Sequence, residues 1–255
     1  MISLLVPYRE DESGTRKAVW TWLREFYETY LPDAEIVVGH YDGTPYSKSA
    51  AVNDAAARAS GDAFVILDAD TLIDPHVITT RAALTTAYTP AWFIPHERAY
   101  RLTQRRTELY LKSDLASPVR PLPEEVEDQI DDAPGFIQVL SRRAFETVGG
   151  MDPRFCGWGG EDSSFVRAVD TLYMPHLRTG NYVLHLWHDR PGAGSSQTRR
   201  WDGQEARVRT LWRAYRRASG DPRAMRALVD EGLGRRERAR LPVCDPAAEH
   251  HNKEP

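Results

Sequence analysis

Two carboxylates, Asp68 and Asp70, stand at alternate positions directly after the apolar run 63–67. The run predicts a buried strand, so both carboxylates lie at its carboxyl end, the edge where open α/β sheets bind ligands. Carboxylate oxygens are the ligands that Mg²⁺ and Mn²⁺ prefer, and a nucleotide diphosphate needs such a cation to balance its charge. The pair therefore indicates metal-assisted nucleotide binding, with simple solvation of a strand end as the alternative.

A second cluster, residues 157–162, combines glycines, an aromatic ring and two carboxylates ahead of a predicted helix. Glycines let the backbone approach a ligand closely, and Trp158 offers a flat apolar face to a sugar ring. With Asp162 as a candidate general base, the cluster predicts a platform for an acceptor hydroxyl. The alternative is a tight turn with a buried Trp and an acidic helix cap. The candidate acceptor-binding residues are Trp158, Gly159, Gly160 and Glu161.

Two histidines, His185 and His188, lie late in the chain, just before the glycine- and serine-rich segment 191–200. On a strand they would point to opposite faces, so we expect only one of them to reach a metal unless a bulge intervenes. The alternative is a core histidine with satisfied hydrogen bonds. The segment 191–200 is predicted to be a mobile loop that closes over a bound donor and excludes water.

Several weaker candidates complete a possible donor side. Arg9, after the first predicted strand, and Lys48 can both meet phosphate charge. Asp42 can accept a hydrogen bond from a base N–H, and Asn53 can bind near a diphosphate. Surface salt bridges and helix caps would explain each of these residues equally well.

These side chains need a parallel sheet to position them. Predicted strands at 2–6, 36–38 and 63–67 alternate with predicted helices at 14–30 and 47–59, which favours a Rossmann-like half. Further along, we expect helices at 75–88 and 103–113, a loop at 117–134, strands at 92–94, 136–140 and 182–186, a helix beginning near Ser163, and Arg-rich amphipathic helices between 203 and 240.

The composition excludes several classes of protein. With 255 residues, 41% of them hydrophobic and 27% charged, the chain suits one α/β domain with an extension. Its net charge of −4 gives no overall attraction to nucleic acid, and no apolar stretch could span a bilayer. Two cysteines, Cys156 and Cys244, cannot form a disulfide framework. We therefore expect a cytoplasmic protein without a membrane span or a nucleic-acid partner.

The ordered motifs resemble a known family. Pro7-Tyr8-Arg9, Lys48 with Asn53-Asp54, and Leu67 to Asp70 resemble the donor half of family 2 glycosyltransferases with the GT-A fold. Residues 148–162 resemble the acceptor motif of beta-1,4-galactosyltransferases and their bacterial chondroitin-synthase relatives. The resemblance covers roughly residues 1 to 190 and implies an α/β GT-A fold, with a Rossmann-like nucleotide-binding half, a mixed central sheet and a helical C-terminal extension. The expected domains are a GT-A domain at 1–195, with a donor half at 1–115 and an acceptor half at 135–195, a helical extension at 196–243 and a flexible tail at 244–255.

The resemblance implies a metal-dependent transfer of sugar from a nucleotide-sugar, with a UDP-sugar favoured, to a hydroxyl of a glycan, glycoconjugate or other acceptor. In the family the second Asp of the D-x-D motif binds Mn²⁺ or Mg²⁺ and the first contacts the nucleotide, which places Asp70 on the metal and Asp68 on the donor. The acceptor-motif Asp is the general base of an inverting displacement, here Asp162. A late His binds the metal, and His188 is preferred to His185. The predicted donor-binding residues, from the motifs and from the weaker candidates above, are Pro7, Arg9, Asp42, Lys48, Asn53 and Asp68.

Other interpretations stay open at this point. A sugar nucleotidyltransferase also combines a Rossmann-like half with Mg²⁺, and residues 14–17 faintly resemble its phosphate loop. The three acidic residues at 10–12 would repel phosphate there, which argues against it. A non-catalytic carbohydrate-binding protein could share the fold. Within the family, a retaining outcome is open because retaining relatives carry a similar Trp-Gly-Gly-Glu turn. The acceptor is also undetermined, because Ser163 and Ser164 stand where the animal enzymes continue with Asp.

Overall fold

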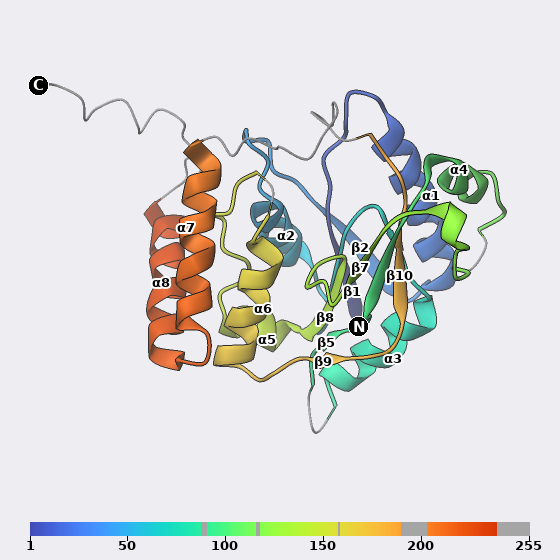
Figure 1. Ribbon diagram of the computed structural model, residues 1–255. Helices are drawn as coiled ribbons and strands as arrows, with labels where there is room; N and C mark the ends of the chain where they lie inside the picture. Colours follow the sequence, from blue (N-terminus) through green and yellow to red (C-terminus); the bar gives the residue numbers. More distant parts are fainter. Residues whose placement is uncertain (88–90, 116–117, 158, 190–202, 239–255) are drawn as a thin grey trace, which may run out of the picture.

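A mixed six-stranded sheet forms the centre of the molecule (Figure 1). The structure is a computed structural model that describes the chain except for residues 88–90, 116–117, 158, 190–202 and 239–255. Across the sheet the strands are β2 (Ala34–Gly39), β1 (Ile2–Pro7), β3 (Ala63–Leu67), β8 (Ile137–Ser141), β5 (Phe93–Ile94) and β9 (Leu177–Arg178). Strands β2, β1 and β3 run parallel, whereas β8 is antiparallel to β3 and β5. The predicted α/β class with a Rossmann-like first half and a mixed central sheet is confirmed.

A second, four-stranded sheet brings distant segments of the chain to the end of β3. Its order is β4 (Thr71–Leu72), β10 (Tyr182–His185), β6 (Arg98–Leu102) and β7 (Val126–Asp131). Strand β4 begins immediately after Asp70, and its pairing with β10 sets His185 opposite Thr71. Because the backbone N–H of Leu186 also donates to the carbonyl of Asp70 at 2.8 Å, the end of β10 is fixed beside the two carboxylates after β3.

Helices cover both faces of the central sheet, and each has an apolar face that explains its place. Along α1, Val19, Leu23, Phe26 and Tyr27 recur at helical spacing, and all four are buried. Helix α2 begins after Ser47, whose hydroxyl accepts a hydrogen bond from the N–H of Ala50. The helices are α1 (Thr15–Tyr30), α2 (Lys48–Arg58), α3 (Pro75–Thr85), α4 (Gln104–Leu111), α5 (Arg142–Thr147), α6 (Glu161–Leu172), α7 (Gly203–Ala218) and α8 (Pro222–Arg238).

The prediction of a loop at 117–134 is wrong, because this segment contains strand β7. Strand β7 pairs antiparallel with β6 at the edge of the second sheet. Only Val126 and Ile130 are partly buried, while the residues between them are acidic or amide side chains exposed to solvent. Charged residues on an edge strand discourage pairing with other chains, and they also remove the apolar pattern by which a strand is predicted.

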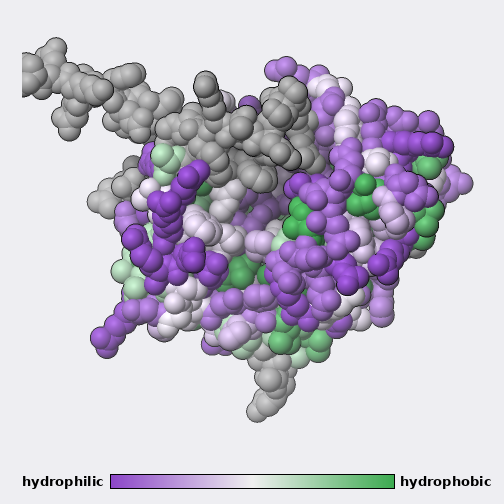
Figure 2. Space-filling view, in the orientation of Figure 1, coloured by the Kyte–Doolittle hydropathy of each residue, from purple (hydrophilic) through white to green (hydrophobic). Residues whose placement is uncertain are grey.

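The C-terminal helices confirm the predicted amphipathic, Arg-rich region. In α7, Val208, Tyr215 and Ala218 are buried, whereas Arg209 and Arg213 are exposed. The face drawn in Figure 2 is largely hydrophilic, with apolar side chains in small separate patches. No helix in the described part of the chain is long and apolar enough to cross a membrane. The expected loop at 191–200 and the expected tail after residue 243 lie outside the described residues.

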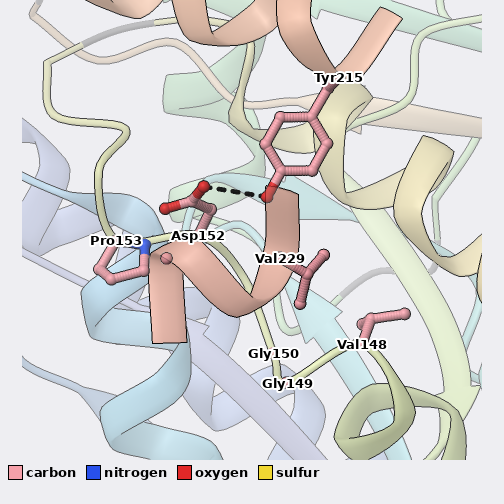
Figure 3. A pocket seen from close by; sticks show the side chains of 8 residues that line it. Val148, Gly149, Gly150, Asp152, Pro153, Tyr215 and Val229 are labelled. Atoms are coloured by element: carbon pink, nitrogen blue, oxygen red, sulfur yellow. Dashed lines mark hydrogen bonds between the residues drawn. The ribbon is translucent and has the colours of Figure 1, made fainter. Parts of the chain in front are cut away.

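A buried polar network attaches α7 and α8 to the segment before α6. Arg154 donates to Asp152 at 2.7 Å and to the carbonyl of Leu228 in α8 at 2.8 Å. The hydroxyl of Tyr215 in α7 donates to the same carboxylate at 2.9 Å, as drawn in Figure 3. The side chains of Asp152 and Arg154 are only 6% and 7% exposed. Because buried charges must be paired, this network fixes the C-terminal helices to residues 152–154.

Tyr215→Phe should lower the free energy of unfolding by about 1.5–3 kcal/mol, because it removes a hydrogen bond to a buried carboxylate. Thermal and urea unfolding of the full chain measure this loss. Tyr30→Phe is the matched control, since the Tyr30 hydroxyl also makes one 3.0 Å bond but its side chain is 46% exposed. Equal losses in the two variants would show that the Asp152 network does not secure α7.

Candidate active site

Asp70, His185 and His188 form one compact cluster at the end of β3. The Nε2 atom of His188 lies 3.1 Å from Oδ2 of Asp70, and Nε2 of His185 lies 3.7 Å from Oδ1. One ligand atom from each residue lies within 4.8 Å of the other two. The side chains are between 6% and 12% exposed. A carboxylate and two imidazoles at this spacing can hold a divalent cation such as Mn²⁺ or Mg²⁺ from one side.

The sequence predicts that His185 and His188 point to opposite faces of a strand, which is wrong, because both imidazoles approach Asp70. Strand β10 ends at His185, so the alternation of side chains along a strand no longer applies three residues later. The backbone N–H of Trp187 donates to the hydroxyl of Thr107 at 2.8 Å, and the Nδ1 atom of His188 lies 2.8 Å from the carbonyl of Asp189. These contacts turn the segment after β10 so that both imidazoles approach Asp70.

The electrostatic environment keeps Asp70 ionised. Burial opposes its ionisation, but the charge of His185, the hydrogen bond from His188 and the charge of Arg16 together hold the pKa of Asp70 well below its usual value. The Nη2 atom of Arg16 lies 3.2 Å from Oδ2 of Asp70. An ionised carboxylate is the form that binds a hard cation, so the charge state fits a metal ligand.

Lys48 joins Asp68 of the D-x-D motif to Asp162 of the acceptor motif. Its Nζ atom lies 2.6 Å from Oδ1 of Asp68 and 2.8 and 3.0 Å from the two oxygens of Asp162. Burial opposes the charge of Lys48, but the two carboxylates and Glu161 raise its pKa above the usual value. We predicted a phosphate contact for Lys48 from the sequence, and the structure pairs it with carboxylates.

Two carboxylates begin helix α6, and they have different partners. Lys48 donates to both oxygens of Asp162, whereas burial and then the adjacent negative charge of Asp162 raise the pKa of Glu161 to about 7. A Cβ atom at Gly135 would come within 2.6 Å of Oδ2 of Asp162, so only glycine fits at that position. The helix follows Gly160, whose φ of +90° favours glycine.

The remaining predicted residues are not all directed at one site. Pro7 ends β1 beside Gly39, and Arg9 donates to the carbonyl of Gly43 at 3.1 Å. The amide of Asn53 donates to the carbonyl of Met151 and accepts from its N–H, so this side chain holds the acceptor segment rather than a ligand. Asp42 is exposed, Gly159 has a φ of +103°, and Trp158 lies outside the described residues.

Arg16 is the site residue that the sequence analysis missed. It lies in the first turn of α1, after a loop that follows β1, a position from which side chains reach the carboxyl edge of a parallel sheet. That position could have indicated a site residue, although the sequence pattern of residues 14–17 suggests only a phosphate loop. Its contact with Asp70 depends on a long side chain crossing the edge of the sheet, which no sequence pattern encodes.

Asp70→Asn should abolish binding of Mn²⁺, and His185→Gln and His188→Gln should each weaken it by at least about tenfold, because each removes one candidate ligand. Calorimetric titration with MnCl₂ measures the affinities. His176→Gln is the control, because His176 pairs with Asp170 at 3.0 Å outside the cluster. Unchanged Mn²⁺ affinity in both histidine variants would contradict the site.

Glu161→Gln should change how stability depends on pH. The pKa of Glu161 is about 7 in the folded chain against 4.5 ordinarily, so the folded state holds an extra proton between these values. Its contribution to stability is full below about pH 4.5 and is lost as the pH rises through about 7. From pH 5 to 8 the variant should gain about 1–3 kcal/mol relative to the wild type, measured by urea unfolding in EDTA. The control Glu146→Gln, at an exposed position, should follow the wild-type curve, and parallel curves for all three proteins would contradict the raised pKa.

Comparison with known proteins bears on the segment that contains the acceptor motif. Residues 125–174 match the model of a family described as the N-terminal domain of galactosyltransferase. No curated protein shows significant similarity to the chain.

Several solved structures share a general similarity with most of the chain. The catalytic domain of Drosophila beta1,4-galactosyltransferase 7 in complex with xylobiose is 17% identical, over 82% of this chain and 79% of that one, with a TM-score of 0.45. GalNAc-T7 with UDP, GalNAc and Mn²⁺ is 13% identical, over 91% and 55%, with a TM-score of 0.47. Glucosyl-3-phosphoglycerate synthase from Mycobacterium tuberculosis is 15% identical, over 75% and 73%, with a TM-score of 0.40. The family match over residues 125–174 confirms the resemblance to galactosyltransferases and the glycosyltransferase class predicted from the sequence.

Proposed function

We propose that the chain transfers a sugar from a nucleotide-sugar, with a UDP-sugar favoured, to an acceptor hydroxyl, and that a divalent cation held by Asp70, His185 and His188 takes part. The observation that carries the proposal is the contact of Lys48 with both Asp68 and Asp162, each within 3.0 Å of its Nζ atom. This contact supports a single site, because it joins the motif that binds a donor to the motif that binds an acceptor.

The proposed reaction is a direct displacement that inverts the anomeric carbon. The acceptor oxygen forms a bond to the anomeric carbon, the bond from that carbon to the diphosphate oxygen breaks, and the acceptor proton passes to the carboxylate of Asp162. A bound divalent cation would stabilise the negative charge on the departing diphosphate. Asp68 lies on the donor side, where it orients the nucleotide part.

Three further groups complete the proposed site. Lys48 pairs with both Asp68 and Asp162 and partly balances their charges. Glu161, with a pKa raised to about 7 by burial and by Asp162, is partly protonated at neutral pH and can donate a hydrogen bond to the acceptor. We place these functions on residues 1–195, and the extension at 196–243 supports them through contacts such as that of Trp212 with Ser163 at 3.0 Å.

The first experiment is a calorimetric titration of the full chain with UDP and GDP, with Mn²⁺ present and then with EDTA. Metal-dependent binding of one nucleotide, lost in Asp70→Asn, would support a donor site. Incubation with the matching nucleotide-sugars and Mn²⁺ should then release the nucleoside diphosphate. Release of pyrophosphate from a nucleoside triphosphate and a sugar phosphate, or no nucleotide binding in any condition, would overturn the proposal.

Asp162→Asn should lower turnover by about 10²–10⁴-fold while nucleotide affinity changes little, because the amide cannot accept the acceptor proton. Release of the nucleoside diphosphate in the presence of an acceptor, together with titration of the nucleotide, separates these two effects. Asp170→Asn, on the same helix but paired with His176, is the matched control and should keep the wild-type rate. A wild-type rate in Asp162→Asn would exclude this residue as the base.

A further inference from the structure

Arg16 shares one oxygen of Asp70 with His188, a candidate metal ligand. Its Nη2 atom lies 3.2 Å from Oδ2 of Asp70, and Nε2 of His188 lies 3.1 Å from the same oxygen. The side chain of Arg16 is 30% exposed while that of Asp70 is 6% exposed. The guanidinium therefore reaches from the solvent side of the site to the buried carboxylate, beside any cation that Asp70 binds.

Hydrogen bonds at the start of α1 fix the backbone at Arg16. The carboxylate of Asp11 accepts from the N–H of Arg16 and from the hydroxyl of Thr15. The hydroxyl of Thr15 also accepts from the N–H of Asp189 at 2.9 Å, next to the candidate metal ligand His188. The first turn of α1 and the histidine segment thus form one connected framework around the Asp70 carboxylate.

Buried polar atoms near Arg16 lack hydrogen-bond partners among the described residues. They are the Nε atom of Arg16 and the hydroxyls of Tyr8 and Tyr46. Burial raises the pKa of Tyr46, and the positive charges of Arg16 and Lys48 act against this rise, which places both cations in electrostatic range of the hydroxyl. Arg9 lies over the ring of Tyr46, 6.0 Å from its centre. Donors of this kind without acceptors suit an anion with several oxygen atoms.

Two positive groups would meet at Asp70 when a cation is bound. A divalent cation on this carboxylate would stand next to the positive guanidinium of Arg16, and like charges at such distances repel strongly in a partly buried site. A diphosphate bound to the cation brings negative charge that both positive groups can share. We infer that Arg16 couples the metal to the diphosphate, opposing the binding of the cation alone and binding the diphosphate once both are present.

This coupling rests on the proposed function and adds an order to its binding steps. Because linkage is reciprocal, the factor by which the metal tightens the nucleotide equals the factor by which the nucleotide tightens the metal. Arg16 makes that factor large, so the cation is retained with the donor and is bound weakly without it. A residue that only neutralised Asp70 would affect the cation and leave the nucleotide unchanged.

The test compares Arg16→Gln, Arg16→Lys and the control Arg24→Gln, which removes an exposed arginine of the same helix that pairs with Glu28. Binding of Mn²⁺ alone is measured from the free-ion signal in electron paramagnetic resonance. Binding of UDP, UMP, GDP and GMP is measured by calorimetry at saturating Mn²⁺. Circular dichroism melts show whether each variant is folded. If Arg16→Gln unfolds, Arg16→Lys, which keeps the positive charge, still tests the role of the guanidinium.

Arg16→Gln should bind Mn²⁺ alone about threefold more tightly or better, because a positive neighbour is removed. It should bind the nucleoside diphosphate about tenfold more weakly or worse, since a charge-assisted hydrogen bond is lost. The monophosphate should lose less affinity than the diphosphate. Arg16→Lys should keep the weak binding of Mn²⁺ alone and lose part of the diphosphate affinity, and Arg24→Gln should match the wild type.

The outcomes separate this inference from the proposed function. Wild-type protein that binds neither diphosphate with Mn²⁺ overturns both. Wild-type binding that Arg16→Gln leaves unchanged overturns the coupling and leaves the proposed function standing. Equal losses for monophosphate and diphosphate, or weaker Mn²⁺ binding by Arg16→Gln in the absence of nucleotide, would also overturn the role of Arg16.

Discussion

The site depends on the ion pairs of the Lys48 ammonium group, because they join carboxylates from two distant parts of the chain. Asp68 follows β3 and Asp162 begins α6, and Lys48 contacts both from the first turn of α2. Without a cation between them, two carboxylates this close would repel, and both would prefer to be protonated or separated. The hydroxyl of Ser47, beside it, also donates to the carbonyl of Phe155, so the backbone on both sides of this contact is fixed.

The sheets explain why the site lies at this edge. The central sheet delivers Asp70 at the end of β3, and the second sheet delivers His185 by pairing β10 with β4. The two sheets thus meet where β3 passes into β4, and the cluster of three candidate metal ligands stands at that junction. A site built on strand ends is positioned by backbone hydrogen bonds, which restrict the side chains more than a loop would.

The sequence predicted the parts of this arrangement that follow from local patterns. Apolar runs located β1 and β3, and the two carboxylates after β3 and the acidic start of α6 were identified as site residues. Strand β7 was missed because an edge strand with exposed acidic residues has no apolar pattern. The orientation of His185 and His188 was not predicted because it depends on where β10 ends. The contacts of Lys48 and Arg16 were not predicted because their long side chains reach elements that only the tertiary structure brings together.

Glu161 and Asp162 show how neighbouring carboxylates can acquire different chemistry. Both stand in the first turn of α6, where the helix dipole favours negative charge, so their position alone does not distinguish them. Lys48 donates to both oxygens of Asp162, whereas Glu161 is left beside that negative charge with its pKa raised to about 7. An ionised carboxylate can accept a proton, and a protonated one can donate a hydrogen bond. A single lysine that pairs with one of the two therefore distinguishes the proposed base from the proposed acceptor-binding group.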